Sequence, residues 1–250
     1  MKLLLINPNT SQSVSDLIEA EARRAAAPGT EVRVLTAPLG VAYIETRFEA
    51  LIGAYAAATL AAEHWREHDA IVVAAFGDPG LAGLREALDI PVVGLTEAAL
   101  MSACMLGQRF SIIAISARIQ AWYRETVQAN GLLDRLASIR SLDQPLRDIA
   151  TVQEDHAERL QALCRSAVED DGADVIIIAG APLAGLARTI RQRIPVPVVD
   201  GVSSAVNHAQ SLVSLAPVPA RRGSFAPPPV KPNQGLSEAL ARLLAGSHRP

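Results

Sequence analysis

The stretch LAGLREALDIPVVGLTEAA occupies residues 81–99, and LAGLARTIRQRIPVPVVDGVSSA occupies residues 183–205. The two stretches align when a few residues are gapped, and each follows an apolar segment that begins after an aspartate, Asp69 or Asp174. Two unrelated strand–helix units could match in this way through composition alone. Because the order of the flanking strands and helices also matches, we interpret the pair as an internal duplication.

Each half of this duplication is predicted to alternate short β-branched strands with helices. The expected strands are 3–6, 31–35, 71–75 and 91–93 in the first half and 110–115, 138–142, 175–179 and 197–199 in the second; the expected helices are 12–26, 47–67 and 81–87, then 118–128, 149–169 and 183–192. Continuous apolar strands are typical of parallel sheets with both faces covered. The predicted fold class is therefore α/β, with two pseudo-symmetric lobes, each a short parallel β-sheet flanked by helices.

The chain is predicted to cross between the two lobes twice. We assign residues 1–100 and 207–250 to lobe 1 and residues 101–206 to lobe 2. The Pro-rich segment 216–235 can form neither a regular helix nor a central strand, so we expect it to wrap over the surface. A final helix at 236–244 is expected to pack back on lobe 1.

The composition indicates a globular protein with a large core, since half of its 250 residues are hydrophobic. The formal net charge of −3 lacks the basic excess of a nucleic-acid-binding protein. No apolar run approaches the roughly 20 residues that span a bilayer. No secretory signal pattern precedes the first strand, so we expect a cytoplasmic protein whose partner is a small molecule, with no nucleic acid and no membrane.

Several potential sites for metals, phosphates or disulfides do not develop into motifs. No glycine-rich dinucleotide loop and no P-loop is present. His64 and His68 have a metal-like spacing but lack a third ligand, so we expect no metal. Cys104 and Cys164 fall inside helix patterns and are interpreted as small buried hydrophobic residues.

Ligands of open α/β sheets bind beyond the carboxyl ends of the strands. The matched loops AAFGDPG (74–80) and AGAPLAG (179–185) are therefore expected to face one another across a cleft between the lobes. Asp78 in the first loop could accept a proton or orient a ligand, or it could bond its own backbone as a turn residue.

Polar residues that follow the other strands have the same two interpretations. Asn7, Asn9 and Thr10 follow the first strand and could bind a ligand or cap the next helix. Ser116, at the corresponding place in the second half, could likewise bind a ligand or cap a helix. Tyr43 lies in the loop after the second strand.

Three motifs together resemble the aspartate/glutamate/hydantoin racemase superfamily, and within it the hydantoin and allantoin racemases. They are INPNTS (6–11), FGDPGL (76–81) and PVVDGVSSAV (197–206), and the resemblance covers nearly the whole chain in order. It implies two flavodoxin-like lobes with the active site in the cleft between them. It also implies no cofactor and a homo-oligomer.

The usual reaction of the family moves a proton at a carbon next to a carbonyl. One cysteine removes the proton from one face and a second cysteine donates a proton to the other, each from the end of a third strand. By resemblance these cysteines correspond to Ala75 and to Gly180, with Ala181 as the next candidate. A methyl group and a hydrogen cannot transfer protons, so the two-thiol mechanism is not open to this chain.

The resemblance therefore predicts a cofactor-independent isomerase-type enzyme, a racemase or epimerase, that acts on a hydantoin, ureido acid or dicarboxylate. Asp78 is the predicted catalytic residue. The predicted substrate-binding residues are Asn7, Asn9, Thr10, Tyr43, Ala75, Phe76, Gly77, Ser116, Gly180 and Ala181. The alternatives are a cysteine-independent lyase or hydrolase, or a non-catalytic small-molecule binding protein. An engineered cysteine replacement at Ala75 would leave the second loop unexplained.

Overall fold

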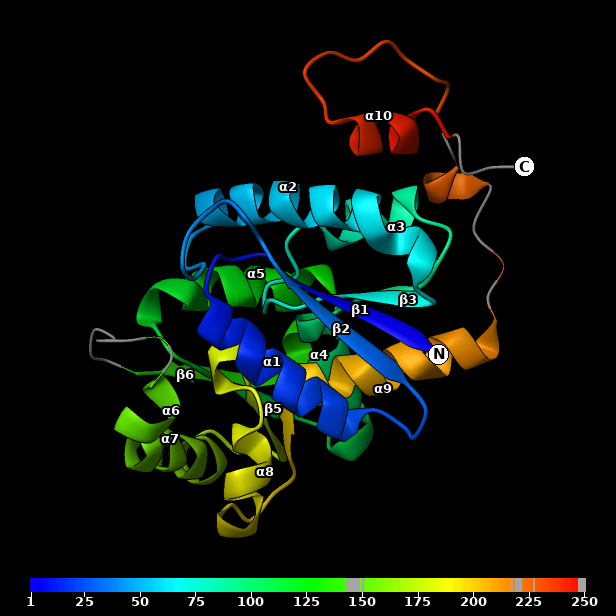
Figure 1. The fold of residues 1–250 in the computed structure, drawn as a ribbon. Coiled ribbons are helices and arrows are strands. Elements are labelled where there is room, and N and C mark those ends of the chain that lie inside the picture. The colour runs from blue at the N-terminus through cyan, green and yellow to red at the C-terminus, as the bar shows by residue number, and fades with distance from the viewer. Residues whose placement is uncertain (143–148, 150, 217, 219–221, 227, 247–250) are drawn as a thin grey trace.

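The computed structural model describes residues 1–142, 149, 151–216, 218, 222–226 and 228–246 (Figure 1). Its strands form two four-stranded, wholly parallel sheets. Sheet 1 has the order β2-β1-β3-β4, with β1 Lys2–Asn7, β2 Glu31–Thr36, β3 Ala70–Val73 and β4 Val92–Gly94; sheet 2 has the order β6-β5-β7-β8, with β5 Phe110–Ala114, β6 Leu136–Ser141, β7 Val175–Ile178 and β8 Val198–Asp200. The predicted α/β fold with two similar lobes is confirmed.

Helices cover both faces of each sheet. They are α1 Gln12–Ala25, α2 Arg47–His64, α3 Leu81–Ala87, α4 Leu95–Leu106, α5 Gln120–Ala129, α6 Val152–Asp155, α7 Ala157–Glu169, α8 Leu186–Ile190, α9 Gly201–Leu215 and α10 Glu238–Leu244, with single 3-10 turns η1 to η6 at Trp65–Glu67, Ala117–Ile119, Leu133–Arg135, Ala181–Leu183, Arg191–Arg193 and Gly223–Phe225. In β1, Leu3 and Leu5 face α1 and α9, whereas Leu4 and Ile6 face α2 and α3. This period-two alternation buries all four side chains.

The two sheets end in matching ways. Ile6 pairs with Val73 in sheet 1, and Ile113 pairs with Ile178 in sheet 2. From each third strand the chain takes seven residues to reach a left-handed glycine that begins the next helix, from Val73 to Gly80 (φ 81°) and from Ile178 to Gly185 (φ 82°).

These landmarks set the alignment of the repeats. They place Ala75 at the position of Gly180 and Leu81 at that of Leu186. The sequence match pairs Leu81 with Leu183 instead, so it is out of register by three residues there. The error arises because LAGL occurs in both halves, once within the helix and once within the loop before it.

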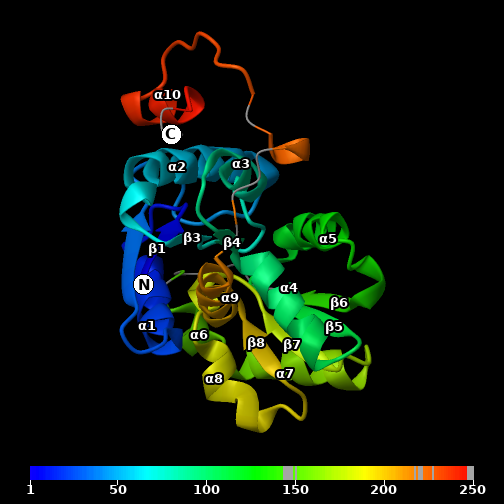
Figure 2. The same ribbon diagram turned by 90° about the vertical axis from the view of Figure 1, so that its right-hand side faces the viewer.

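Helices α4 and α9 cross between the lobes and lie side by side in the middle of the molecule (Figure 2). Residues of α4 join the core around sheet 2, and residues of α9 join the core on one face of sheet 1. Ser102 Oγ and His208 Nε2 lie 3.2 Å apart, each eight residues after the N-cap of its helix. The predicted lobe boundaries fall inside these two helices and stay predictions.

Some expected elements are interrupted. The helix expected over 149–169 begins at Val152 and breaks at His156, between α6 and α7. The expected C-terminal helix is present as α10, which packs on α2 through Leu243. Among the helices that the structure describes, none combines the length and hydropathy needed to cross a bilayer.

Candidate active site

The two central strands, β1 and β5, end in equivalent turns. Asn9 Oδ1 accepts a hydrogen bond from the Ser11 N–H at 2.9 Å, and Ser116 Oγ accepts one from the Arg118 N–H at 3.2 Å. The pairing of Ile6 and Ile113 with their neighbouring strands puts Asn9 and Ser116 at the same place in the repeat. Each lobe thus presents a polar side chain at an equivalent position just after its central strand.

Asn7 and Asn9 have different hydrogen-bonding roles in the turn after β1. Asn7 is fully buried, and its Nδ2 donates to Asn9 Oδ1, to the Ser11 carbonyl and to Ser15 Oγ. Its amide is therefore fully used in holding the start of α1. The Asn9 oxygen is also used, but within the described residues the Asn9 Nδ2 makes no hydrogen bond. Asn9 is the better placed of the two to bind a ligand.

The loop between β2 and α2 folds over the same edge of sheet 1. Thr10 anchors it, because its N–H donates to the Val41 carbonyl at 2.9 Å. Tyr43 is half-buried in this loop; burial and a hydrogen bond to Glu45 raise its pKa to about 12. The positive charge of Arg118, which belongs to lobe 2, acts in the opposite direction and lowers this pKa. Charged groups of both lobes therefore act on the Tyr43 hydroxyl.

The first cleft loop is held from behind by aromatic side chains. A Cβ on Gly77, whose φ is 100°, would overlap the indole ring of Trp122. The Gly77 N–H donates to Thr96 Oγ1 at 2.5 Å. The Phe76 and Tyr123 rings lie with their centroids 4.7 Å apart and their planes tilted by 55°, and both belong to the core around sheet 2. Glycine is required at position 77 because the backbone passes directly over the indole.

The sequence pattern did not identify Trp122 and Tyr123 as neighbours of this loop. Trp122 and Tyr123 lie on α5, where their spacing indicates only a buried helix face. Nothing in that pattern predicts which loop of the other lobe they meet.

Asp78 caps a helix that is distant in sequence. Its Oδ1 accepts the Thr96 N–H at 2.8 Å and its Oδ2 accepts the Glu97 N–H at 2.9 Å, so the carboxylate sits on the N-terminus of α4. The N-cap residue itself is Gly94, on which a Cβ would overlap the Asp78 carboxyl group. In lobe 2 the corresponding N-cap, Asp200, caps α9 with its own side chain.

Burial dominates the electrostatics of Asp78. It raises the pKa of this carboxyl group to about 7, while the N–H groups of Thr96 and Glu97 act to lower it. Asp78 also has a left-handed backbone with φ of 50°. A carboxyl group that titrates near neutrality is suited to acid–base chemistry, although here both oxygens are bonded to α4.

The second cleft loop has no side chain at the critical position. Gly180 has a φ of 101°, and a Cβ built there would lie 3.6 Å from Pro182 Cδ, an ordinary contact. Space is therefore present, but the backbone conformation is one that glycine favours. Ala75, at the equivalent position of the first loop, is 8% exposed.

Each cleft loop packs into the opposite lobe. Phe76 of the first loop belongs to the core around sheet 2, whereas Ala181 and Ala184 of the second loop belong to the core of sheet 1. The structure thus brings both predicted loops to the boundary between the lobes. Among the described residues, no three His, Cys, Asp or Glu side chains gather where a metal ion could bind.

Fold and site together define a duplicated, two-lobed α/β protein with paired loops at the ends of equivalent strands. The family described as Asp/Glu/Hydantoin racemase matches residues 3–209. The chain belongs to this family.

Individual relatives cover almost the full length. A hydantoin racemase from Paenarthrobacter aurescens is 34% identical over 92% of this chain and 99% of its own. A hydantoin racemase from Pseudomonas sp. (strain NS671) is 31% identical over 97% of this chain and 98% of its own. The structure of an allantoin racemase from Klebsiella pneumoniae superposes with a TM-score of 0.91 at 33% identity, over 96% of this chain and 98% of the other. The resemblance to this branch of the family is confirmed.

Proposed function

We propose that this chain is a cofactor-independent enzyme that acts at the carbon next to a carbonyl in a hydantoin, a ureido acid or a dicarboxylate. Full-length similarity to hydantoin and allantoin racemases supports the substrate class. The equivalent turns at Asn9 and Ser116 support a ligand held between the lobes, with one polar group from each.

The observation that carries the proposal is the matched pair of Ala75 and Gly180. The two residues occupy equivalent positions after β3 and β7, and neither has a group that can carry a proton. The reaction proposed here therefore proceeds without two thiols. The backbone N–H groups of the two loops are proposed to stabilise negative charge on the substrate carbonyl oxygen, as donors fixed in advance do in other enzymes.

Asp78 is the proposed acid–base residue. Its pKa of about 7 lies near the operating pH of a neutral enzyme, where proton transfer is most effective. It stands three residues from Ala75 in the same loop, and its N–H donates to the Ala75 carbonyl at 3.1 Å.

The direct test is exchange of the α-proton. Each enantiomer of a 5-substituted hydantoin is incubated with the protein in D₂O, after dialysis against a chelator. Loss of the C5 proton signal in NMR and loss of optical rotation are followed together. We expect exchange with the wild-type protein, and a rate lower by at least about 100-fold in Asp78→Asn.

Two controls sharpen this test. Asp16→Asn removes an exposed carboxylate on α1 and is expected to leave exchange unchanged. Asn9→Ala is expected to raise KM more than it lowers kcat, because Asn9 is proposed to bind and not to transfer protons. Equal exchange rates in wild type and Asp78→Asn would remove Asp78 from the mechanism.

A second function, non-catalytic binding of the same class of small molecule, is favoured by the absence of thiols at positions 75 and 180. It predicts that a hydantoin or ureido acid raises the melting temperature while no α-proton exchanges. If no compound of the class either exchanges or stabilises the protein, both functions fail.

A further inference from the structure

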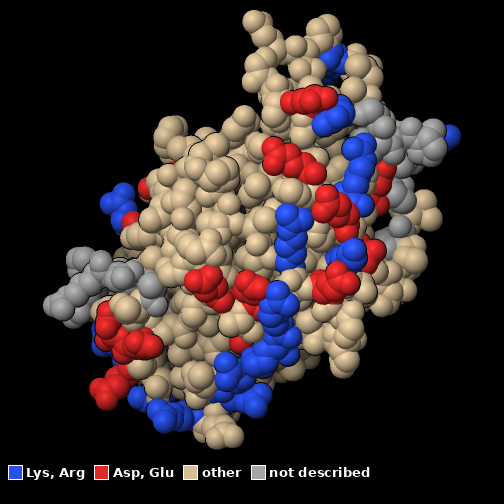
Figure 3. All heavy atoms as spheres, in the orientation of Figure 1, with Lys and Arg blue, Asp and Glu red and all other residues tan. Residues whose placement is uncertain are grey.

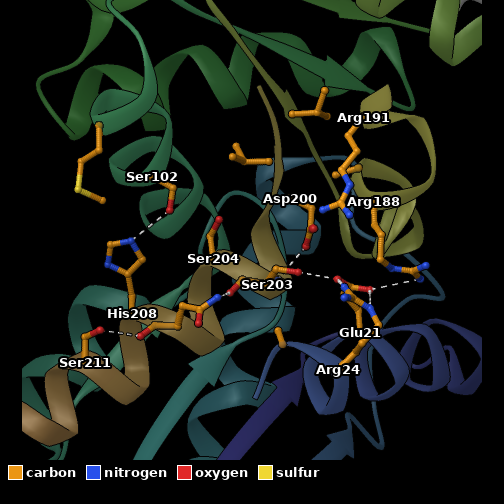
Figure 4. A pocket seen from close by; sticks show the side chains of 16 residues that line it. Glu21, Arg24, Ser102, Arg188, Arg191, Asp200, Ser203, Ser204, His208 and Ser211 are labelled. Carbon is orange, nitrogen blue, oxygen red and sulfur yellow. Dashed lines mark hydrogen bonds and ion pairs between the residues drawn. The ribbon is translucent and has the colours of Figure 1, made fainter. Parts of the chain in front are cut away.

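A cavity lies between α1, α8 and α9 (Figure 4). It has a volume of about 510 Å³, which is within the range of small-molecule sites. α1 of lobe 1 forms one side, and α8, β8, α9 and α4 form the others. None of its lining residues is one of the proposed substrate-binding residues, so this is a separate site.

Both carboxylates in this cavity already accept hydrogen bonds from the protein. Glu21 is 3% exposed; Arg24 forms a two-pronged ion pair with it, and Ser203 Oγ donates to it at 2.5 Å. Asp200 is also buried, and its Oδ1 accepts the Ser203 N–H at the start of α9. Glu21 therefore joins α1 to α9, and Asp200 caps α9, so both acidic groups already have a structural role.

The basic groups, in contrast, are in excess. Arg188 Nη2 lies 3.9 Å from Glu21 Oε2, beyond hydrogen-bond distance. Arg191, one turn further along, forms no ion pair or hydrogen bond within the described part of the chain. Figure 4 shows both guanidinium groups on the same side of the cavity, opposite the Ser204 and His208 side chains of α9. The lining holds three arginines and two carboxylates, which is an excess of one positive charge in a protein whose net charge is negative.

The surface around the cavity has the same character. Figure 3 shows basic side chains gathered where α1 approaches α8. On the opposite lip, Ser102 of α4 and Asn207 and Ser211 of α9 add hydroxyl and amide groups to the lining. Arginine forks with nearby hydroxyl groups are typical of sites for phosphates and carboxylates.

The duplication supplies an internal comparison. The corresponding groove of lobe 1 lies beside β4 and α4, and it is lined largely by apolar side chains such as Leu88, Val93 and Leu212. Val218 and Phe225 of the C-terminal segment lie along that groove. The groove at the equivalent place in lobe 1 is largely apolar. The arginines and hydroxyl groups of the lobe 2 cavity are therefore not a general consequence of the duplicated fold.

We propose that the cavity between α1, α8 and α9 binds a small oxyanion-bearing metabolite, a phosphate ester or a carboxylate, through Arg188 and Arg191. The site is additional to the proposed active site. The Glu21–Arg24 pair lines the cavity, and α9 supplies hydroxyl groups for the rest of the ligand.

The test uses the full chain and three probes: inorganic phosphate, AMP and citrate, each titrated at constant ionic strength made up with chloride. Melting temperature and isothermal calorimetry report binding. We expect saturable binding of at least one probe, and the preferred probe distinguishes a phosphate from a carboxylate ligand. Arg191→Gln is expected to weaken it by about tenfold or more, since it removes a charged hydrogen-bond donor that makes no other contact.

Arg193→Gln is the matched control, because Arg193 lies in the same 3-10 turn but does not line the cavity and instead contacts Gln161. It should bind the probe as the wild type does. Asn9→Ala should also bind normally; if it abolishes binding, the anion occupies the cleft and the proposal is wrong. Equal affinities in wild type, Arg191→Gln and Arg188→Gln/Arg191→Gln, or no saturable binding of any probe, would also overturn it.

Discussion

The Asp78 carboxylate should make this protein less stable as the pH rises towards neutrality. Its pKa is about 7 in the folded protein, against an ordinary value of 3.8 for an aspartate in an unfolded chain. Between these values the folded state binds a proton that the unfolded state does not. The free energy of unfolding therefore falls as the pH rises through this window, and the loss is complete above pH 7.

The size of the effect follows from the pKa difference. Over the range from pH 5 to pH 8, the folded and unfolded states differ in proton binding mainly between pH 5 and the folded pKa of about 7, which is two pH units. Each unit is worth about 1.36 kcal/mol, so the free energy of unfolding falls by at most about 2.7 kcal/mol. This value is an upper bound, because Asp78 keeps some contact with solvent. In a chain of this size it corresponds to a shift in Tm of about 5 to 10 °C.

The assay compares urea unfolding of wild type and Asp78→Asn at pH 5, 6, 7 and 8. Asparagine does not titrate in this pH range. The difference between the pH dependences of the free energy of unfolding therefore isolates Asp78 from all other carboxylates, including Asp200. The wild type should lose more stability than the variant over this range, and Asp16→Asn should follow the wild type. Parallel curves for wild type and Asp78→Asn would refute the reasoning. They would mean that the bonds from Thr96 and Glu97 hold the carboxylate ionised despite its burial.

Three further outcomes are expected. Asp78→Ala should lower the free energy of unfolding by about 1 to 2 kcal/mol because α4 loses its cap. Adding Gly94→Asp should recover part of this loss, because it gives α4 the N-cap that Asp200 provides for α9. Thermal unfolding measures both changes, and a further loss in the double variant would contradict the equivalence of Gly94 and Asp200. Gly77→Ala should lower the free energy of unfolding by about 3 kcal/mol or more, through overlap with the Trp122 indole and backbone strain. The loss should be smaller in a Trp122→Leu background. Additive losses in a double-mutant cycle would show that the two residues are not in contact. Burial raises the pKa of the Cys164 thiol to about 12, so an aromatic disulfide reagent should label it only after unfolding; rapid labelling of Cys164 in the native protein, read by peptide mass, would disprove this.

The strands and most helices could be predicted because their signals are local. Runs such as Ile71–Val73 and Val175–Ile178 are apolar on both faces and β-branched, which identifies central parallel strands. The break at His156 could not be predicted, because the helix pattern continues across it.

The site was predicted only as far as strand ends locate it. Asn9 and Ser116 could be placed at the strand ends because each lies two residues after a strand, and their binding of a ligand stays a prediction. The contact of Asp78 with α4 depends on how two loops 16 positions apart fold together, from Asp78 to Gly94, and no sequence pattern encodes it. A glycine at the N-cap of α4, which cannot cap the helix with a side chain, is a local hint that another residue does so, but it does not identify Asp78. Homo-oligomerisation stays a prediction.

The backbone at Gly180 also makes the two loops unequal in the side chains that they can carry. Position 75 already carries a Cβ, so a thiol could be introduced there through a change of side chain alone. At position 180 any L-residue must first leave a conformation with φ of 101°, so the loop has to be rebuilt before a thiol can be carried. One substitution can therefore place a thiol in the first loop, whereas the second loop needs a change of backbone as well before a thiol could face the first.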